Sequence, residues 1–204
     1  MVLINEYLAV IVGFTLASLG IIVAFTVHPP LRKALPFYDP IADWVGHGIP
    51  DIGMLYMAAV MAGLVSAVVP FWLCSAFFFA SALVFLVRIM TKTSFVWWQD
   101  VLHLLGVLTK GYMFLSVVYW HELLTAHALV YFVGIIVLYA WRTYVSLRAP
   151  GGVMLGRILF NAEHIAMSVA AILMFVIMQW PMETIYRFPL CMPGAAVEMP
   201  KHDH

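Results

Sequence analysis

Long hydrophobic runs alternate with prolines and short polar clusters along most of the chain. A helix that crosses a membrane needs about 20 mostly apolar residues, because the hydrocarbon core is about 30 Å thick and a helix rises about 1.5 Å per residue. Six segments meet this requirement, and they cover residues 7–27, 50–69, 71–89, 97–118, 121–141 and 155–180. The pattern therefore predicts a bundle of six transmembrane helices.

Prolines mark several of the predicted helix boundaries. The first helix is expected to stop before Pro29 and Pro30, which lack the amide hydrogens that a continuing helix needs. Pro50 suits the first turn of the second helix, where the missing donor has no intrahelical acceptor. Pro70 separates the second helix from the third, and Pro181 closes the sixth.

Two segments lie outside the predicted helices. The longest connection, residues 29–49, mixes aromatic and aliphatic residues with polar ones. Such a mixture fits either a short helix lying in the membrane interface or an ordered loop packed over the bundle. Residues 181–204 are expected to form a short exterior tail, so residues 1–204 make up a single transmembrane domain.

The composition agrees with a membrane protein and excludes several other classes. Hydrophobic residues account for 65% of the chain and charged residues for 10%, and the mean hydropathy is +1.01. Soluble domains carry about 45–50% apolar and about 25% charged residues, so we predict an all-α, polytopic integral membrane protein whose main partner is the lipid bilayer. A formal net charge of zero provides no basic surface for nucleic acid. Two cysteines are too few for a disulfide framework.

The distribution of cations predicts the orientation. Seven of the ten Lys and Arg residues fall near the connections that follow the first, third and fifth helices: Arg32, Lys33, Arg88, Lys92, Arg142, Arg148 and Arg157. Cytoplasmic loops are enriched in Lys and Arg. We therefore expect a multi-pass protein of the cell's inner (plasma) membrane, with its N-terminus and its C-terminus both outside the cytoplasm.

Two histidines are predicted to lie at the same depth in the membrane. His103 comes six residues after Trp97, and His164 comes seven residues after Arg157, so each lies about 10 Å inward from the cytoplasmic end of its helix. An ionisable side chain in hydrocarbon costs on the order of 3 kcal/mol and needs a partner. We expect the two imidazoles to meet inside the bundle, with His47 just below them.

Methionines extend this pattern along two helices. Met54 follows Asp51 by three residues on the second helix, and Met167 follows His164 by three on the sixth, which places each pair on one helix face. Thioether sulfur favours Cu(I), and imidazole also binds it, so copper is the preferred metal. The predicted ligands are His103, His164, His47, Asp51, Met54 and Met167. The alternative is that the methionines simply fill the apolar core.

Lys110 lies near the predicted bilayer centre, seven residues beyond His103. An ammonium at this depth needs a carboxylate, so we expect an intramembrane ion pair of Lys110 with Asp100 or Glu163, with Asp51 as a further candidate. A buried cation would also repel a passing metal ion. The sequence therefore favours a fixed metal site beside an ion pair over an open channel.

Three other functions remain as alternatives to copper binding. An accessory subunit of a larger membrane complex could use Gly53, Ala58 and Gly63 for close helix contact with other subunits. A b-type haem protein could use His103 and His164 as axial ligands. A zinc-dependent enzyme ranks below both, because no His-Glu-x-x-His, Gly-x-Ser-x-Gly or phosphate-binding glycine motif occurs.

Overall fold

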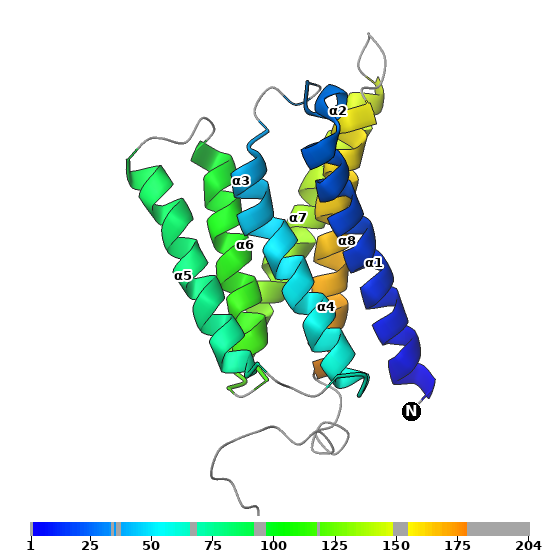
Figure 1. Cartoon of the computed structure of the whole chain (residues 1–204), viewed down its shortest axis with the longest axis vertical. Helices are drawn as coiled ribbons and strands as arrows, with labels where there is room; N and C mark the ends of the chain where they lie inside the picture. The colour runs from blue at the N-terminus through cyan, green and yellow to red at the C-terminus, as the bar shows by residue number, and fades with distance from the viewer. Residues whose placement is uncertain are drawn as a thin grey trace, which may run out of the picture.

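The computed structural model describes residues 2–33, 35, 38–65, 69–91, 97–117, 119–148 and 155–178, and every regular element in these ranges is helical. The elements are α1 (Val2–Val27), α2 (Pro29–Lys33), α3 (Pro40–Asp43), η1 (Trp44–Gly48), α4 (Ile49–Met61), α5 (Phe71–Met90), α6 (Trp97–Leu115), α7 (Glu122–Arg148) and α8 (Leu155–Met178). Figure 1 shows the long helices running side by side, so the prediction of an all-helical bundle is confirmed.

Four of these helices are long and apolar enough to cross a membrane. They are α1 over Glu6–Val27, α5, α7 and α8. The other two predicted spans do not qualify: α4 has 13 residues, and α6 has 19 residues but contains Asp100 and Lys110. The fold is thus compatible with a multi-pass membrane protein that has four candidate spans among the described residues.

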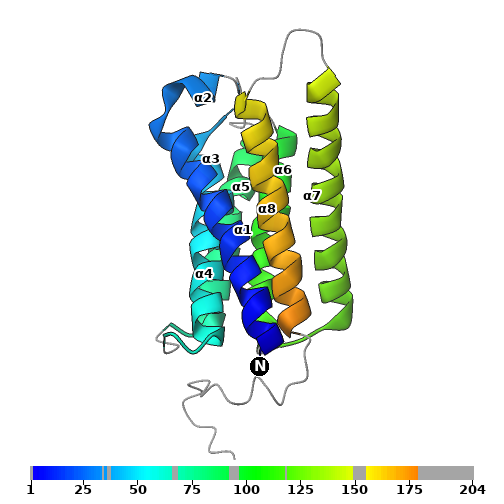
Figure 2. The same cartoon turned by 90° about the vertical axis from the view of Figure 1, so that its right-hand side faces the viewer.

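Helix α8 lies at the centre of the packing. It contacts α1 on one side and α7 on the other, as Figure 2 shows, while α5 packs mainly against α6. In α8, 61% of the most apolar window is buried, compared with 22–33% in the other three candidate spans. Four polar residues of α8, Asn161, Glu163, His164 and Ser168, therefore lie inside the bundle, whereas Arg157 is exposed.

The second predicted helix begins ten residues earlier than expected. Elements α3, η1 and α4 follow one another without a break from Pro40 to Met61. The Asp39 side chain accepts hydrogen bonds from the amides of Ala42 and Ile41, which caps the helix, and Pro40 occupies the first turn. The expected connection at 29–49 is therefore mostly helical, because α2 and residues 40–49 lie within it.

The same helix ends at Met61, eight residues before the predicted boundary. Gly63 adopts a positive φ of 70°, a conformation that glycine accepts without a steric penalty. The amide of Leu64 donates to the carbonyl of Ala59, and the amide of Gly63 donates to that of Val60. These two bonds form a Schellman motif, which stops the helix although the sequence beyond it remains apolar.

The other boundaries agree more closely with prediction, except that α7 continues to Arg148 rather than ending at Trp141. The predicted tail at 181–204 lies outside the described residues.

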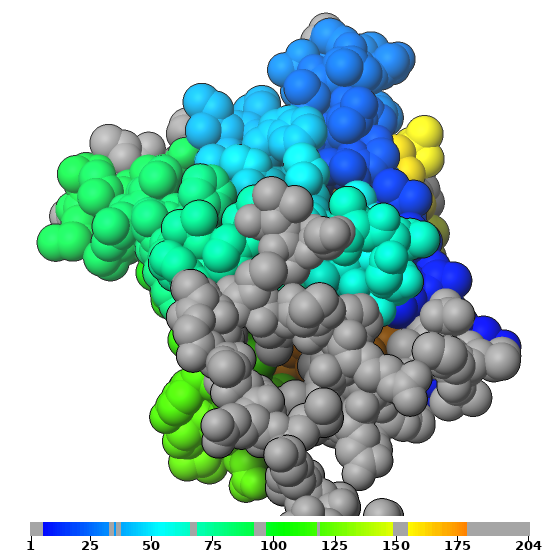
Figure 3. Space-filling view, turned by 60° about the horizontal axis from the view of Figure 1, so that its bottom comes forward, coloured from blue at the N-terminus to red at the C-terminus, as the bar shows by residue number. Residues whose placement is uncertain are grey.

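Helix α5 lies at the edge of the molecule, on the side away from α1 (Figure 3), and it exposes large apolar side chains, among them Trp72, Phe77 and Leu83. Such a surface suits contact with lipid.

The methionine stripes contribute to the hydrophobic core. Met54, Met57 and Met174 are fully buried and belong to one apolar cluster with Phe114 and Phe175. Flexible thioether side chains fill irregular spaces between helices well. This part of the core occupies the half of the bundle toward the C-terminal ends of α4, α6 and α8.

Candidate metal centre

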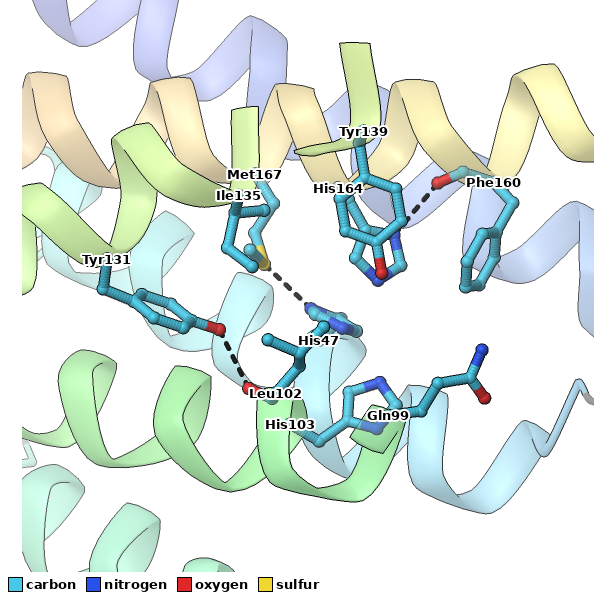
Figure 4. A pocket seen from close by; sticks show the side chains of 10 residues that line it. All are labelled: His47, Gln99, Leu102, His103, Tyr131, Ile135, Tyr139, Phe160, His164 and Met167. Atoms are coloured by element: carbon cyan, nitrogen blue, oxygen red, sulfur yellow. Dashed lines mark hydrogen bonds between the residues drawn. The ribbon is translucent and has the colours of Figure 1, made fainter. Parts of the chain in front are cut away.

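Three histidines from three helices come together in the other half of the bundle. His47 belongs to η1, His103 to α6 and His164 to α8, and each offers a ring nitrogen within 4.8 Å of the others. Their side chains are buried, with exposed fractions of 3%, 8% and 4%. Figure 4 shows the three rings gathered beside Met167. The expected meeting of His103 with His164 is therefore present, and His47 joins them.

The π-helical turn η1 positions His47. Pro50 has no amide hydrogen to donate to the carbonyl of Gly46, four residues earlier, and η1 ends at Gly48, two residues before it. Gly46 also allows α6 to approach closely, because a Cβ at this position would lie 2.7 Å from Cδ2 of His103. The sequence around Pro50 thus produces a wide turn against which the His103 ring packs.

Hydrogen bonds indicate which nitrogens are available to a ligand. Nδ1 of His164 lies 2.9 Å from the carbonyl oxygen of Phe160. A carbonyl can only accept, so Nδ1 carries a hydrogen, and in the neutral ring Nε2 keeps its lone pair. Nε2 of His47 and Nδ1 of His103 are buried without a hydrogen-bond partner among the described residues. Each ring therefore has one nitrogen free to bind a metal ion.

The ring nitrogens lie no more than 4.8 Å apart, and this upper limit can be compared with the spacing in a bound metal site. An ion at the centre of a triangle with sides of 4.8 Å lies about 2.8 Å from each corner, compared with about 2.0–2.1 Å in zinc–imidazole sites. Movements of less than about 1 Å at each ring close this difference. The three imidazoles therefore form a possible metal-binding group.

Met167 lies next to the histidines, because its Sδ lies 2.8 Å from Nδ1 of His47; its role as a ligand stays a prediction. Both side chains line a small cavity together with His103, His164 and neighbouring residues: Gln99, Leu102, Tyr131, Ile135, Tyr139 and Phe160. Met54 is buried in the apolar cluster and is not among the residues that line this cavity. Its role as a ligand stays a prediction.

A chain of buried polar groups runs beside the histidines. The ammonium of Lys110 lies 3.7 Å from Asp51 and 3.5 Å from the carbonyl oxygen of Gly46. The Ser18 hydroxyl lies 2.5 Å from an oxygen of Asp51 and 3.1 Å from an oxygen of Glu163. Oε2 of Glu163 in turn lies 2.5 Å from Nδ1 of His164. Asp51 is therefore a partner of Lys110 and of Ser18, whereas its role as a metal ligand stays a prediction.

The expected pairing of Lys110 with Asp100 is wrong. Ten residues separate them on α6, which corresponds to about 15 Å along a helix axis. Asp100 instead lies 3.1 Å from Nε of Arg88, at the end of α5. Glu163 contacts Ser18 and His164, and the ion-pair contact of Lys110 is with Asp51.

Arg88 joins α5 and α6 to the start of α3. Its guanidinium lies 2.7 Å from Asp39 as well as 3.1 Å from Asp100. Burial raises the pKa of Asp39, but the hydrogen bond and charge of Arg88 together with the two capping amides outweigh burial and lower this pKa below its usual value. This contact holds the capping residue of α3 in place.

Sequence reasoning missed two polar residues at this site. Asp43 lies in α3 and forms a second possible metal-binding group with His47 and Glu163. The sequence feature that could have revealed Asp43 is the Asp39-Pro40 pair, because it starts a helix and so places Asp43 one turn before His47. Ser18 of α1 had no such signal, because a serine in an apolar helix often bonds only to its own backbone.

Comparisons with protein-family models, with curated proteins and with solved structures find no match to this chain.

Proposed function

We propose that this chain is a multi-pass membrane protein that binds a transition-metal ion, with copper as the first candidate, through His47, His103 and His164. The observation that carries the proposal is the meeting of three buried imidazoles from separate helices, with unpartnered nitrogens on His47 and His103. Buried polar groups are normally hydrogen-bonded. A bound cation would supply the partner that none of the described residues provides.

We propose that six helical segments cross the membrane, with the histidines in the half nearer the cytoplasm. The segment from Pro40 to Met61 and helix α6 lie alongside the four apolar helices (Figures 1 and 2), and their polar residues Asp51 and Lys110 are fully buried. Arg88 and Arg148 lie near the end of the bundle that carries α2. Basic residues favour the cytoplasmic side, which supports outward-facing termini.

The ligand chemistry favours copper over harder ions. Three imidazoles suit zinc, copper, iron or nickel, while a thioether selects for soft Cu(I). The sulfur of Met167 lies beside His47, so it can approach an ion held by that ring. Each imidazole ligand remains neutral when it binds, which suits a buried site.

Metal analysis of the full-length protein tests this proposal. Protein purified in detergent from copper-supplemented cells should retain copper. His103→Ala and His164→Ala should each lower the retained copper at least tenfold. His127→Ala provides the matched control, because His127 is exposed on α7 and contacts the carbonyl of Leu123. A folded wild-type protein that retains no metal and binds neither added copper nor added zinc would refute the proposal.

The haem alternative has less support. A haem with two axial histidines needs a flat space between the two rings. Here the ring of His47 lies 4.9 Å from that of His103 and 4.5 Å from that of His164, measured between centroids. Because the His47 ring lies this close to both of the other rings, the space among the three rings suits a small ion rather than a macrocycle.

The accessory-subunit alternative depended on small residues that would be available for close contact with another subunit. A Cβ added at Gly53 would lie 3.0 Å from the rings of Phe114 and Phe78, so this glycine packs inside the bundle. Ala58 is likewise buried, with an exposed fraction of 1%. Gly63 is exposed at the helix end, so Gly53 and Ala58 do not support a shared face for another subunit.

A further inference from the structure

We infer that the centre takes two metal ions, with a second divalent cation bound by Asp43, His47 and Glu163. One ligand atom from each of these residues lies within 4.8 Å of the others, and all three residues are buried. This inference rests on the proposed function, because His47 belongs to both groups. The second group is richer in oxygen and lies toward α3.

Asp43 is held in a defined position and retains one free oxygen. The Tyr38 hydroxyl donates a hydrogen bond of 2.9 Å to Oδ2 of Asp43. The other oxygen, Oδ1, is buried without a hydrogen-bond partner among the described residues, and the side chain as a whole is only 4% exposed. A buried acceptor left unsatisfied is costly, and a cation at this point would satisfy it.

Glu163 and His47 face one another across the same space. Oε1 of Glu163 lies 3.9 Å from Nδ1 of His47 and accepts from Ser18 at 3.1 Å. This separation is too long for a hydrogen bond. It is close to the distance between two ligand atoms bound to one metal ion, because ligands at about 2.1 Å in tetrahedral geometry are about 3.4 Å apart.

Formal charge gives an independent argument. Three buried carboxylates, Asp43, Asp51 and Glu163, share this region with Lys110, which is the one buried Lys or Arg in the part of the chain that the structure describes. With all three carboxyl groups ionised, Lys110 charged and His164 neutral, as a metal ligand is, two negative charges are left uncompensated. Buried charge without a partner is strongly unfavourable, and one divalent cation supplies the missing charge.

The two subsites differ in chemistry and share one ring. Two carboxylates and an imidazole suit a harder divalent ion such as Mn²⁺, Fe²⁺ or Zn²⁺, whereas the three-histidine subsite has only nitrogen ligands and is softer. An imidazole has two nitrogens, so His47 can serve both ions. When both nitrogens bind, the ring gives up its proton.

Counting bound Zn²⁺ tests the inference, because borderline Zn²⁺ suits both ligand sets. Full-length protein in detergent, stripped with a chelator and dialysed against Zn²⁺, should bind two equivalents. Asp43→Asn and His103→Ala should each bind one, and His47→Ala should bind none. Asp39→Asn is the matched control and should bind two, because Asp39 pairs with Arg88 outside this cluster.

The outcomes separate this inference from the proposed function. One equivalent in the wild type, unchanged in Asp43→Asn, would overturn the second subsite and leave the proposed function standing; the carboxyl groups would then be balanced by protons. No bound Zn²⁺ or copper would overturn both. If Asp43→Asn fails to fold by circular dichroism, Tyr38→Phe tests the same subsite. Loss of the hydroxyl that holds Asp43 should lower the affinity for the second Zn²⁺ ion about tenfold.

Discussion

Replacing Gly46 with alanine should displace His103 and weaken metal binding. The new Cβ would lie 2.7 Å from Cδ2 and 3.1 Å from Cγ of His103, both well inside van der Waals contact. The ring cannot turn away freely, because Phe85 and His47 lie 5.3 Å and 4.9 Å from it, measured between centroids. Overpacking of this kind costs about 1–3 kcal/mol.

The helix propensity of alanine offsets part of this loss, since alanine is favoured over glycine by about 1 kcal/mol. Gly134→Ala isolates that gain, because a Cβ there meets nothing within 4 Å. Gly46→Ala should therefore be less stable than Gly134→Ala by about 1–3 kcal/mol in thermal unfolding in detergent. Its Zn²⁺ affinity should fall about 10- to 100-fold, as expected when a supporting contact of a ligand is lost.

A double-mutant cycle identifies the cause. If the Cβ acts by pushing the imidazole, Gly46→Ala should cost much less stability when His103 is already alanine. An equal cost in both backgrounds would mean that the glycine matters for the backbone of η1 alone, and the steric argument would be refuted.

Three further results are expected. Lys110→Met should destabilise the protein by about 3–5 kcal/mol, because it leaves Asp51 buried without its cation, and adding Asp51→Asn should recover part of this loss in thermal unfolding. The pKa of Asp39 is lowered, so its ion pair stabilises the fold above about pH 4 and the benefit disappears as the pH falls through the lower folded pKa. Asp39→Asn should therefore cost less than about 1 kcal/mol at pH 6, and this cost should shrink as the pH is lowered below about 4, in unfolding curves recorded across this range. Met167→Leu should lower Cu(I) affinity about tenfold and leave Zn²⁺ affinity unchanged, whereas Met174→Leu should change neither in competition titrations.

Helix positions that depend on apolar length could be predicted from the sequence, while those that depend on local capping were harder. Helices α5 and α8 begin at the predicted residues, because a long apolar run fixes them. The early start at Pro40 depends on the Asp39 cap, which lies in the segment 29–49 that the sequence leaves open between an interfacial helix and an ordered loop. The early end at Met61 depends on the left-handed Gly63.

At the site, depth could be predicted but lateral neighbours could not. The rise per residue placed His103 and His164 at one level, and the structure brings them together; their role as ligands stays a prediction. Helix rise alone could also have excluded Lys110 from Asp100. The contact of Ser18 with Asp51 depends on how α1 packs against α4, which no pattern within one helix specifies.

The uneven filling of the bundle bears on the direction in which an ion could exchange. The histidines lie nearer the end that carries α2, while the opposite half is filled by side chains with no exposed surface, such as Met57, Phe114 and Phe175. In the part of the chain that the structure describes, this half of the core is mainly apolar, and buried polar side chains in it, such as Ser75 and Thr125, bond to backbone carbonyl groups. We therefore expect a bound ion to enter and leave through the basic end only, so that the protein retains its metal rather than passing it across the bilayer.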